Sequence, residues 1–192
     1  MAKRIQQTYA PFPTVTPKIE AWFCNLTEPD QYNEKYDVGI VVDDSPACQA
    51  MIDKLVTFQN DQLTKDGRDT EDTLLCLKDE KTKNDVTGKW EDLTGRKLLF
   101  FKTRDMSKVG VVGADKKPTD PANIRKGDTV RVSGQAAFGY MKGDPYLTLY
   151  LNAVQHVEGG GASGVDAFDI ETDEPAAPEP AEAFNDDDVD LE

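Results

Sequence analysis

The last part of the chain carries no positive charge, and this limits which residues can fold. From Gly159 to Glu192 the sequence contains twelve acidic residues and no Lys or Arg. Closely spaced like charges repel one another, and such a segment has too little apolar surface to bury, so we expect disorder from about residue 159 onward. Its first residues, GGGASG, are typical of a flexible linker. The sequence therefore predicts a folded domain at 1–158 and a disordered acidic tail at 159–192.

The predicted domain is nearly neutral, in contrast to the tail. The whole chain has a net charge of −14, but residues 1–158 hold 22 basic and 24 acidic residues. This length suits one domain with a real core. No apolar stretch reaches the length of a membrane span, and the N-terminus lacks the apolar region of a signal peptide. Cys24, Cys48 and Cys76 are odd in number and widely spaced, which predicts buried, reduced thiols and a cytoplasmic protein.

Local patterns predict several short strands and one substantial helix. A helix is expected over residues 45–67, because Ser45 can cap its start and Gly67 its end. Its apolar residues recur at helical spacing and should pack on a sheet; they are Ala47, Met51, Ile52, Leu55, Phe58 and Leu63. Residues 1–17 are expected to form an extended arm and residues 79–96 a polar hairpin. Strands are predicted at 18–26, 36–44, 73–78, 97–104, 129–141 and 146–157.

Strand alternation assigns faces to the last two predicted strands. Leu147, Leu149 and Leu151 share one face and should fill the core, as should Val130 and Val132. The opposite face then carries Tyr146, Tyr150 and Arg131. Residues 97–104 are apolar on both faces, so alternation does not decide their orientation. Short strands, one helix and Gly-rich turns together predict a mainly β fold, an OB-fold Greek-key barrel with the helix laid against it.

A basic segment lies ahead of the acidic tail. Between Arg96 and Lys142 there are eleven basic and four acidic residues, a local net charge of +7. Such a segment suggests a polyanion-binding surface, with the tail as an internal competitor. Aromatic rings beside cations suit single-stranded nucleic acid, because bases stack on the rings while the backbone follows the charges. An alternative remains open, that the tyrosines pack on neighbouring strands. The candidate nucleic-acid-binding residues are Lys97, Phe101, Lys102, Arg104, Lys116, Lys117, Arg131, Tyr140, Tyr146 and Tyr150.

The sequence offers no catalytic constellation, and we expect neither enzyme activity, nor a metal site, nor a cofactor. The single histidine, His156, has no Cys or Asp at metal-ligand spacing. No Gly-rich loop with a following Lys-Ser/Thr is present to hold a phosphate. Asp43 and Asp44 could in principle hold Mg²⁺ with Asp53, but an acidic turn before a helix cap explains them better.

Two runs in the basic half of the chain, VGADKKP (112–118) and SGQAAFGY (133–140), carry a resemblance. The sequence is similar to tailed-phage single-stranded DNA-binding proteins that have an OB-fold and an acidic C-terminal tail, most strongly over residues 97–160. The resemblance implies a protein that coats and protects single strands in phage DNA replication, recombination or repair, with little sequence preference, in the host cell cytoplasm.

In similar proteins the tail competes with DNA and contacts replication proteins such as a polymerase or helicase. Many of those tails end in an aromatic residue, whereas this one ends in Leu191 and Glu192. The residues carried over as a partner-binding tail are Phe184, Asp186, Asp187, Asp188, Val189, Asp190, Leu191 and Glu192.

Two other functions remain open. The protein could be an acidic DNA mimic or chaperone-like protein that binds basic partners, in which case it would not bind DNA once the tail is removed. It could also be a metal-dependent nuclease that uses scattered aspartates, which cleavage dependent on divalent metal would reveal. No membrane partner is expected. The choice between DNA and RNA, binding to duplex DNA, the site size and a homodimeric state are left open.

Overall fold

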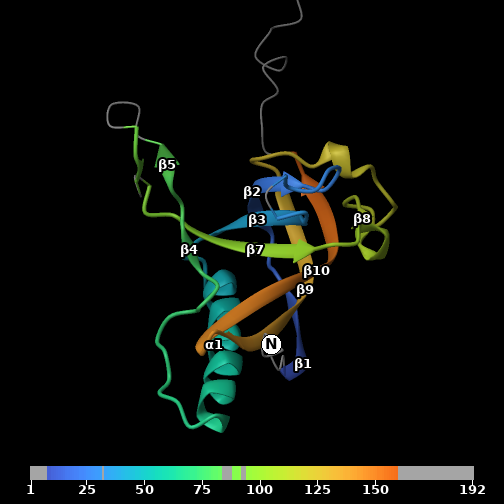
Figure 1. Ribbon diagram of the computed structural model, residues 1–192. Helices are drawn as coiled ribbons and strands as arrows, with labels where there is room; N and C mark the ends of the chain where they lie inside the picture. Colours follow the sequence, from blue (N-terminus) through green and yellow to red (C-terminus); the bar gives the residue numbers. More distant parts are fainter. Residues whose placement is uncertain (1–7, 32, 84–87, 92–93, 160–192) are drawn as a thin grey trace, which may run out of the picture. The chain divides into compact units, whose positions relative to one another are not determined.

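Two long strands close the sheet of this protein into a barrel. In the computed structural model, which describes residues 8–31, 33–83, 88–91 and 94–159, β9 (Thr129–Met141) and β10 (Asp144–Glu158) pair antiparallel along most of their length. The sheet order is β1-β9-β2-β3-β7-β10-β8, and the additional β9–β10 pairing closes the ring β9-β2-β3-β7-β10 (Figure 1). The remaining strands of this sheet are β1 (Thr8–Val15), β2 (Ile19–Asn25), β3 (Tyr36–Val42), β4 (Lys78–Asp79), β7 (Lys97–Thr103) and β8 (Gly110–Val112).

A closed ring of this kind, with one helix beside it, is an OB-like fold, so the predicted fold class is confirmed. The described residues belong to the first of two units into which contacts divide the chain, Met1–Gly161 and Ala162–Glu192. The domain boundary after residue 158 stays a prediction. The tail residues, 184 and 186–192 included, lie outside the described part of the chain.

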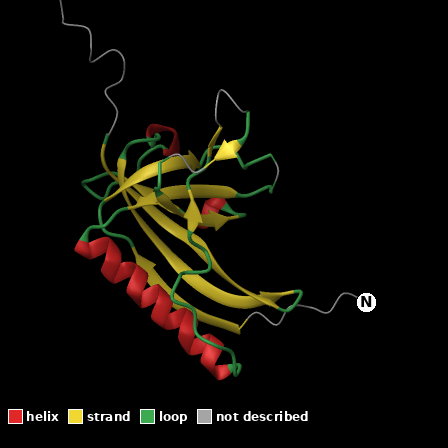
Figure 2. Cartoon of the chain, turned by 90° about the vertical axis from the view of Figure 1, so that its left-hand side faces the viewer, coloured by secondary structure: helices red, strands yellow, loops and turns green. Residues whose placement is uncertain are grey.

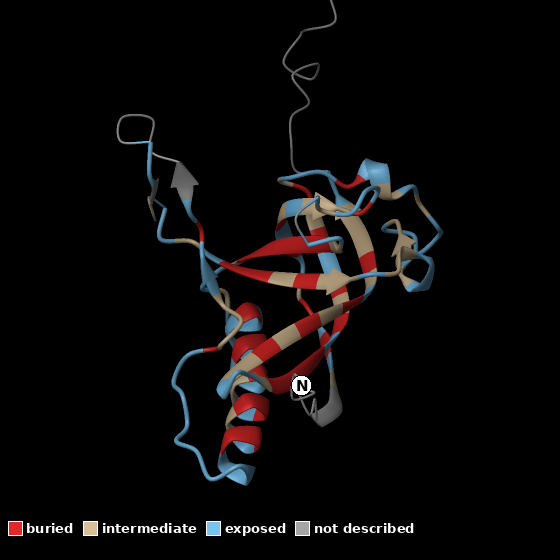
Figure 3. Ribbon diagram, viewed as in Figure 1, coloured by how far each residue is buried: buried red, intermediate tan, exposed pale blue. Residues whose placement is uncertain are grey.

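The alternating residues of β9 and β10 fill the barrel as predicted. Leu147, Leu149 and Leu151 are at most 5% exposed, and Val130 and Val132 are fully buried. Figure 3 shows the resulting alternation of buried and less buried positions along β10, and along β9 as far as Gln135, after which residues 136–139 are all buried. Full burial of one such side chain contributes about 1.5–3 kcal/mol, so these positions specify which side of each strand faces inward.

The helix α1 (Pro46–Lys65) begins and ends where its capping residues predict. The Ser45 hydroxyl accepts a hydrogen bond from the Cys48 amide at 3.2 Å, and Gly67 adopts a left-handed φ of +69° just beyond the helix. The helix lies along the sheet and contacts β1 and β9 (Figure 2). The predicted apolar stripe is buried except for Ala47, which is exposed because Cys48 occupies the inward position.

Two predictions of local structure differ from the structure. The expected arm contains β1, which pairs with β9. Residues 73–77 do not form a strand, because the Gln59 side chain of α1 takes up hydrogen bonds of their backbone. Its amide nitrogen donates to the Thr73 carbonyl at 3.0 Å, and its amide oxygen accepts from the Leu75 amide at 2.8 Å. Between β7 and β9 the chain forms β8 and two short 3₁₀ turns, η1 (Met106–Lys108) and η2 (Pro121–Asn123). The polar hairpin is present as β5 (Thr82–Lys83) and β6 (Trp90–Glu91).

The close approach of neighbouring strands explains why residue 134, in the SGQAAFGY run, is a glycine. A Cβ placed on Gly134 would lie 2.3 Å from the Tyr150 carbonyl oxygen and 2.6 Å from the Phe101 ring. No side chain fits there, so glycine lets β9 cross β10 over the buried Phe101. None of the helices within the described residues is long and apolar enough to cross a membrane.

Candidate nucleic-acid interface

The outward side of three neighbouring strands carries an aromatic surface. On β3, Val38 and Ile40 are fully buried, so Asp37 and Gly39 turn outward. On β7, Leu99 and Phe101 are fully buried, so Phe100 and Lys102 turn outward as well. We call this surface the β2–β3–β7 face. It comprises Trp22, Phe23, Asp37, Gly39, Leu98, Phe100 and Lys102.

Two phenylalanines flank a glycine across this face. Phe23 pairs in register with Gly39, and Gly39 pairs with Phe100. The Phe100 ring lies over the glycine backbone, since a Cβ there would be 2.9 Å from ring atom Cε1. Phe23 is 42% exposed, which is unusual for so large an apolar side chain. The face therefore presents flat apolar groups to solvent.

Cations surround the Phe100 ring. The Lys78 and Lys102 ammonium groups lie 5.4 and 5.6 Å from its centroid. Lys78 belongs to β4, where it pairs with Leu98 of β7. Contacts of this length are cation–π interactions, and they leave each ammonium able to bind a phosphate beside a base stacked on the ring.

A second ring with cations stands at Trp22. Trp22 follows the fully buried Ala21 and so faces outward, and a bulge in the β2–β3 register between Ala21 and Phe23 turns Phe23 to the same side. The Lys126 ammonium lies 3.4 Å from the Trp22 ring centroid, and the Arg96 guanidinium 5.1 Å from it. Arg96 is held in place by Glu20 at 2.8 Å and by Glu80 at 3.6 Å.

A surface depression joins the two rings. It has a volume of about 500 Å³. Its lining combines apolar and charged side chains: Trp22, Leu77, Lys78, Asp79, Lys81, Leu98 and Phe100. Aromatic walls with cations at the edges are the arrangement that accepts single-stranded bases without reading their identity.

One acid is buried within this surface. Asp37 is 4% exposed, and its Oδ2 lies 3.8 Å from the Lys102 ammonium. Burial raises the pKa of the Asp37 carboxyl, and the charge of Lys102 opposes this rise. The carboxylate reduces the positive charge that Lys102 offers to a ligand.

Among the residues predicted from the sequence, Lys102 and Tyr150 lie side by side on the outward surface, because they pair in register between β7 and β10. Lys97 lies at the start of β7 and is paired with Asp79 at the edge of the depression. The prediction for Phe101 is wrong. Its ring is fully buried in the core and cannot stack on a base.

Tyr140 and Tyr146 lie in another region, the β9–β10 arm, which we define as residues 136–149 at the turn end of the hairpin. The Tyr140 hydroxyl donates to Asp66 at 2.5 Å, and Arg68 lies 4.7 Å from its ring centroid. The Tyr146 side chain lies against Gly139 of the paired strand. These contacts favour the alternative that the two tyrosines pack within the protein, and a role for them in nucleic-acid binding stays a prediction.

The other predicted cations are spread over the molecule. Arg131 lines a groove with residues of β1 and α1. Arg104 is exposed beyond the end of β7. Lys116 and Lys117 follow β8, which β10 separates from β7, and Lys117 pairs with Asp115 at 3.0 Å. These four residues are not brought together with the aromatic rings.

Sequence reasoning missed most of the aromatic site. Trp22, Phe23, Phe100, Lys78, Arg96 and Lys126 were not among the candidates. The adjacent Trp22 and Phe23 were the available signal, since neighbours in a regular strand face opposite ways and one of two large rings must then face outward. The bulge at Trp22 has no signature in the sequence.

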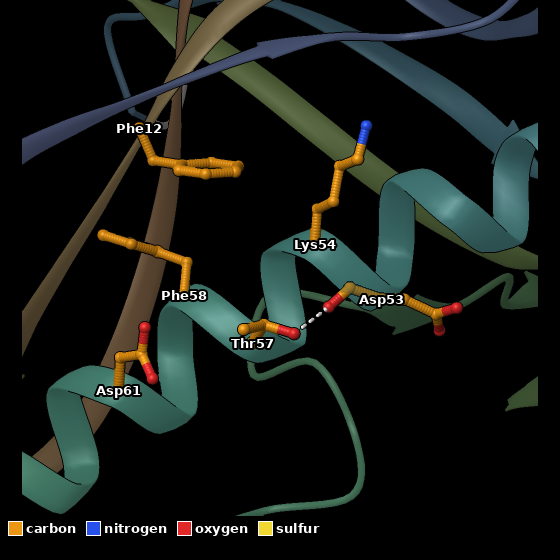
Figure 4. Close-up of a pocket in the computed structure, with 6 residues that line it drawn as sticks. All are labelled: Phe12, Asp53, Lys54, Thr57, Phe58 and Asp61. Carbon is orange, nitrogen blue, oxygen red and sulfur yellow. Dashed lines mark hydrogen bonds between the residues drawn. The ribbon is translucent and has the colours of Figure 1, made fainter.

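A smaller pocket lies between β1 and α1 (Figure 4). Phe12 and Phe58 stack there with ring centroids 5.2 Å apart, and Asp53, Lys54, Thr57 and Asp61 complete the lining. The Thr57 hydroxyl donates to the Asp53 carbonyl at 2.8 Å. Two carboxylates at its edge disfavour a phosphate backbone, so this pocket is not part of the candidate interface.

Comparison with solved structures supports the OB-like fold. No protein-family model and no curated protein matches the sequence. Among solved structures, the fold is similar to the single-stranded DNA-binding protein from bacteriophage Enc34 in complex with ssDNA, with a TM-score of 0.57 and 14% identity, over 77% of this chain and 86% of that one. It is also similar to gp2.5, a single-stranded DNA binding protein encoded by bacteriophage T7, with a TM-score of 0.53 and 17% identity, over 88% of this chain and 100% of that one. At these identities the similarity establishes a shared fold.

Proposed function

We propose that this protein binds single-stranded DNA through the β2–β3–β7 face and covers it with little sequence preference. The observation that carries the proposal is the pair of outward rings, Trp22 and Phe100, each beside two cations and joined by one depression. Stacking on such rings is worth roughly 1–3 kcal/mol per base and suits any base. The fold shared with phage single-stranded DNA-binding proteins supports the same function.

We further propose that this binding serves phage DNA replication, recombination or repair in the host cytoplasm, without catalysis. No group of acidic, His or Cys side chains in the described residues could hold a metal ion. The chemistry of the β2–β3–β7 face is that of a binding surface, because its rings and cations can hold a strand.

Binding to a short labelled oligothymidylate, titrated with salt, tests the proposal. Affinity should fall with a log–log slope of about −0.7 for each phosphate contacted. Photocrosslinking to an oligonucleotide that carries 5-iodouracil, followed by peptide mapping, should attach DNA to peptides containing Trp22, Phe23 or Phe100. Crosslinks confined to the groove between β1 and α1 would overturn the assignment of the face, and absence of binding would overturn the function.

The acidic tail is proposed to compete with DNA for this face and to recruit replication proteins. A short flexible linker gives an effective concentration on the order of millimolar, so even a weak internal contact would partly occupy the site. A chain ending after Val157 should bind DNA more tightly, most clearly at low salt, and should no longer recruit a polymerase or helicase. Equal affinity of both chains at low salt would exclude the competition. Loss of DNA binding on truncation would instead favour the acidic-mimic alternative.

A further inference from the structure

We propose that Asp37 limits the affinity of the β2–β3–β7 face for DNA, by neutralising Lys102 in the free protein and taking up a proton when DNA binds. This inference rests on the proposed function. It concerns Asp37, which has no ring on which a base could stack. A carboxylate is unexpected in the middle of a surface that should attract a polyanion.

Few groups around Asp37 compensate the negative charge of its carboxylate. It is 4% exposed, and its Oδ1 finds no hydrogen-bond donor in the described part of the chain. Its Oδ2 lies 3.8 Å from the Lys102 ammonium, too far for a hydrogen bond. Burial of a carboxylate with so little compensation costs free energy, so the carboxylate attracts the nearest cation.

The neighbours from each packed element identify Lys102 as that cation. On β7, Lys102 stands opposite Asp37 in register, and on β2 the opposite residue is the neutral Asn25. The Cys24 thiol also interacts electrostatically with Asp37, but burial raises the pKa of this thiol to about 12, so it stays protonated. Two more charges act from further away, Asp30 and Lys78.

DNA binding changes this balance. A phosphate that approaches the face attracts Lys102, whose ammonium already lies beside the Phe100 ring. As Lys102 turns to the phosphate, Asp37 loses its compensating charge and gains a negative neighbour. Both changes raise the pKa of the Asp37 carboxyl above its value in the free protein, where burial has already raised it.

The sign of the pH effect follows. The bound state holds more protons than the free state between the two pKa values of Asp37, so affinity rises as pH falls through that window. The proton comes from solvent, and Lys102 remains charged throughout. Below the free-state pKa the carboxyl is protonated in both states, and its contribution to the slope ends.

The experiment compares Asp37→Asn with the wild-type chain and with Asp61→Asn, which changes the net charge equally but lies on α1. Affinity for oligothymidylate is measured at constant ionic strength from about pH 5 to 8. Asp37→Asn should bind roughly three- to tenfold more tightly at neutral pH and lose most of the pH dependence, while Asp61→Asn should follow wild type. The single histidine, His156, is present in all three chains, so a difference in slope belongs to Asp37.

A second variant, Lys102→Gln, gives two further tests, and the second of them keeps the inference testable even if Asp37→Asn folds poorly. Lys102→Gln should cost less affinity in the wild-type chain than in the Asp37→Asn chain, because Asp37 already neutralises part of the lysine charge. In the wild-type chain alone, Lys102→Gln should flatten the pH profile. Binding by the wild-type chain with no gain in Asp37→Asn and unchanged pH profiles would overturn the role of Asp37, whereas no binding by the wild-type chain would overturn the proposed function itself.

Discussion

The β2–β3–β7 face and the β9–β10 arm both place aromatic rings beside cations, but they use them differently. In the arm, Arg68 lies over the Tyr140 ring and also donates a hydrogen bond to the Gly143 carbonyl at 2.8 Å, while the Tyr140 hydroxyl donates to Asp66. On the face, Phe100 has no hydrogen-bonding group, and its cations come from two different strands. The Tyr140 ring is fixed because both Tyr140 and its partner Arg68 make hydrogen bonds within the protein. The Phe100 ring makes none, so it is available to a ligand.

The largest expected effect separates the two regions by binding. Replacing both Trp22 and Phe100 with Ala should remove about 1–3 kcal/mol of binding free energy for each lost stack. Replacing Tyr140 and Tyr146 with Ala should leave affinity nearly unchanged. Fluorescence anisotropy with a labelled oligonucleotide measures both, after circular dichroism has shown that each variant is folded. Equal losses in the two double variants would remove the distinction between the regions.

Substitutions around the β9–β10 arm should instead change the free energy of unfolding. Arg68→Ala deletes the hydrogen bond to the Gly143 carbonyl and the contact with the Tyr140 ring, and should lower the free energy of unfolding by about 1–2 kcal/mol. DNA affinity should not change. Lys65→Ala, at the same end of α1, is the matched control in urea denaturation. If the two variants are equally stable, the arm is not held by Arg68.

A smaller effect is expected at the glycine beneath Phe100. The methyl group of Gly39→Ala would lie 2.9 Å from the Phe100 ring and must displace it, which should weaken DNA binding roughly three- to tenfold through the lost stacking geometry. Gly110→Ala is the control, since its methyl would meet Ala153 at an ordinary 3.7 Å. Unchanged affinity in Gly39→Ala would show that the position of this ring is not critical.

The smallest effect concerns the cations beyond β8. Lys117 already pairs with Asp115, so Lys117→Ala should change the salt slope by less than the value of about 0.7 that one phosphate contact contributes. Lys78→Ala, beside Phe100, should change it by about that full amount. Salt titrations of both variants at one temperature compare them directly. A larger change in Lys117→Ala would extend the interface to the turn after β8.

The sequence predicted the barrel more fully than the site, for identifiable reasons. Strict alternation in β10 assigned Leu147 and Leu149 to the core, and the capping residues of α1 marked its ends. In β7 both faces are apolar, so only the pairing with β3 determines that Phe101 faces inward and Phe100 outward. The bulge that places Phe23 on the same side as Trp22, and the approach of Lys126 from a distant turn, depend on tertiary structure.

The strand β1 has a consequence for contacts between copies of this protein. It ends the sheet order, and an edge strand can pair with the edge of another molecule and start aggregation. Within β1, however, Pro11 and Pro13 supply no amide hydrogens, so a ladder that tried to extend from this edge would be interrupted twice. Copies that the proposed DNA binding would bring together can therefore stand next to one another without a continuous ladder forming between their β1 edges.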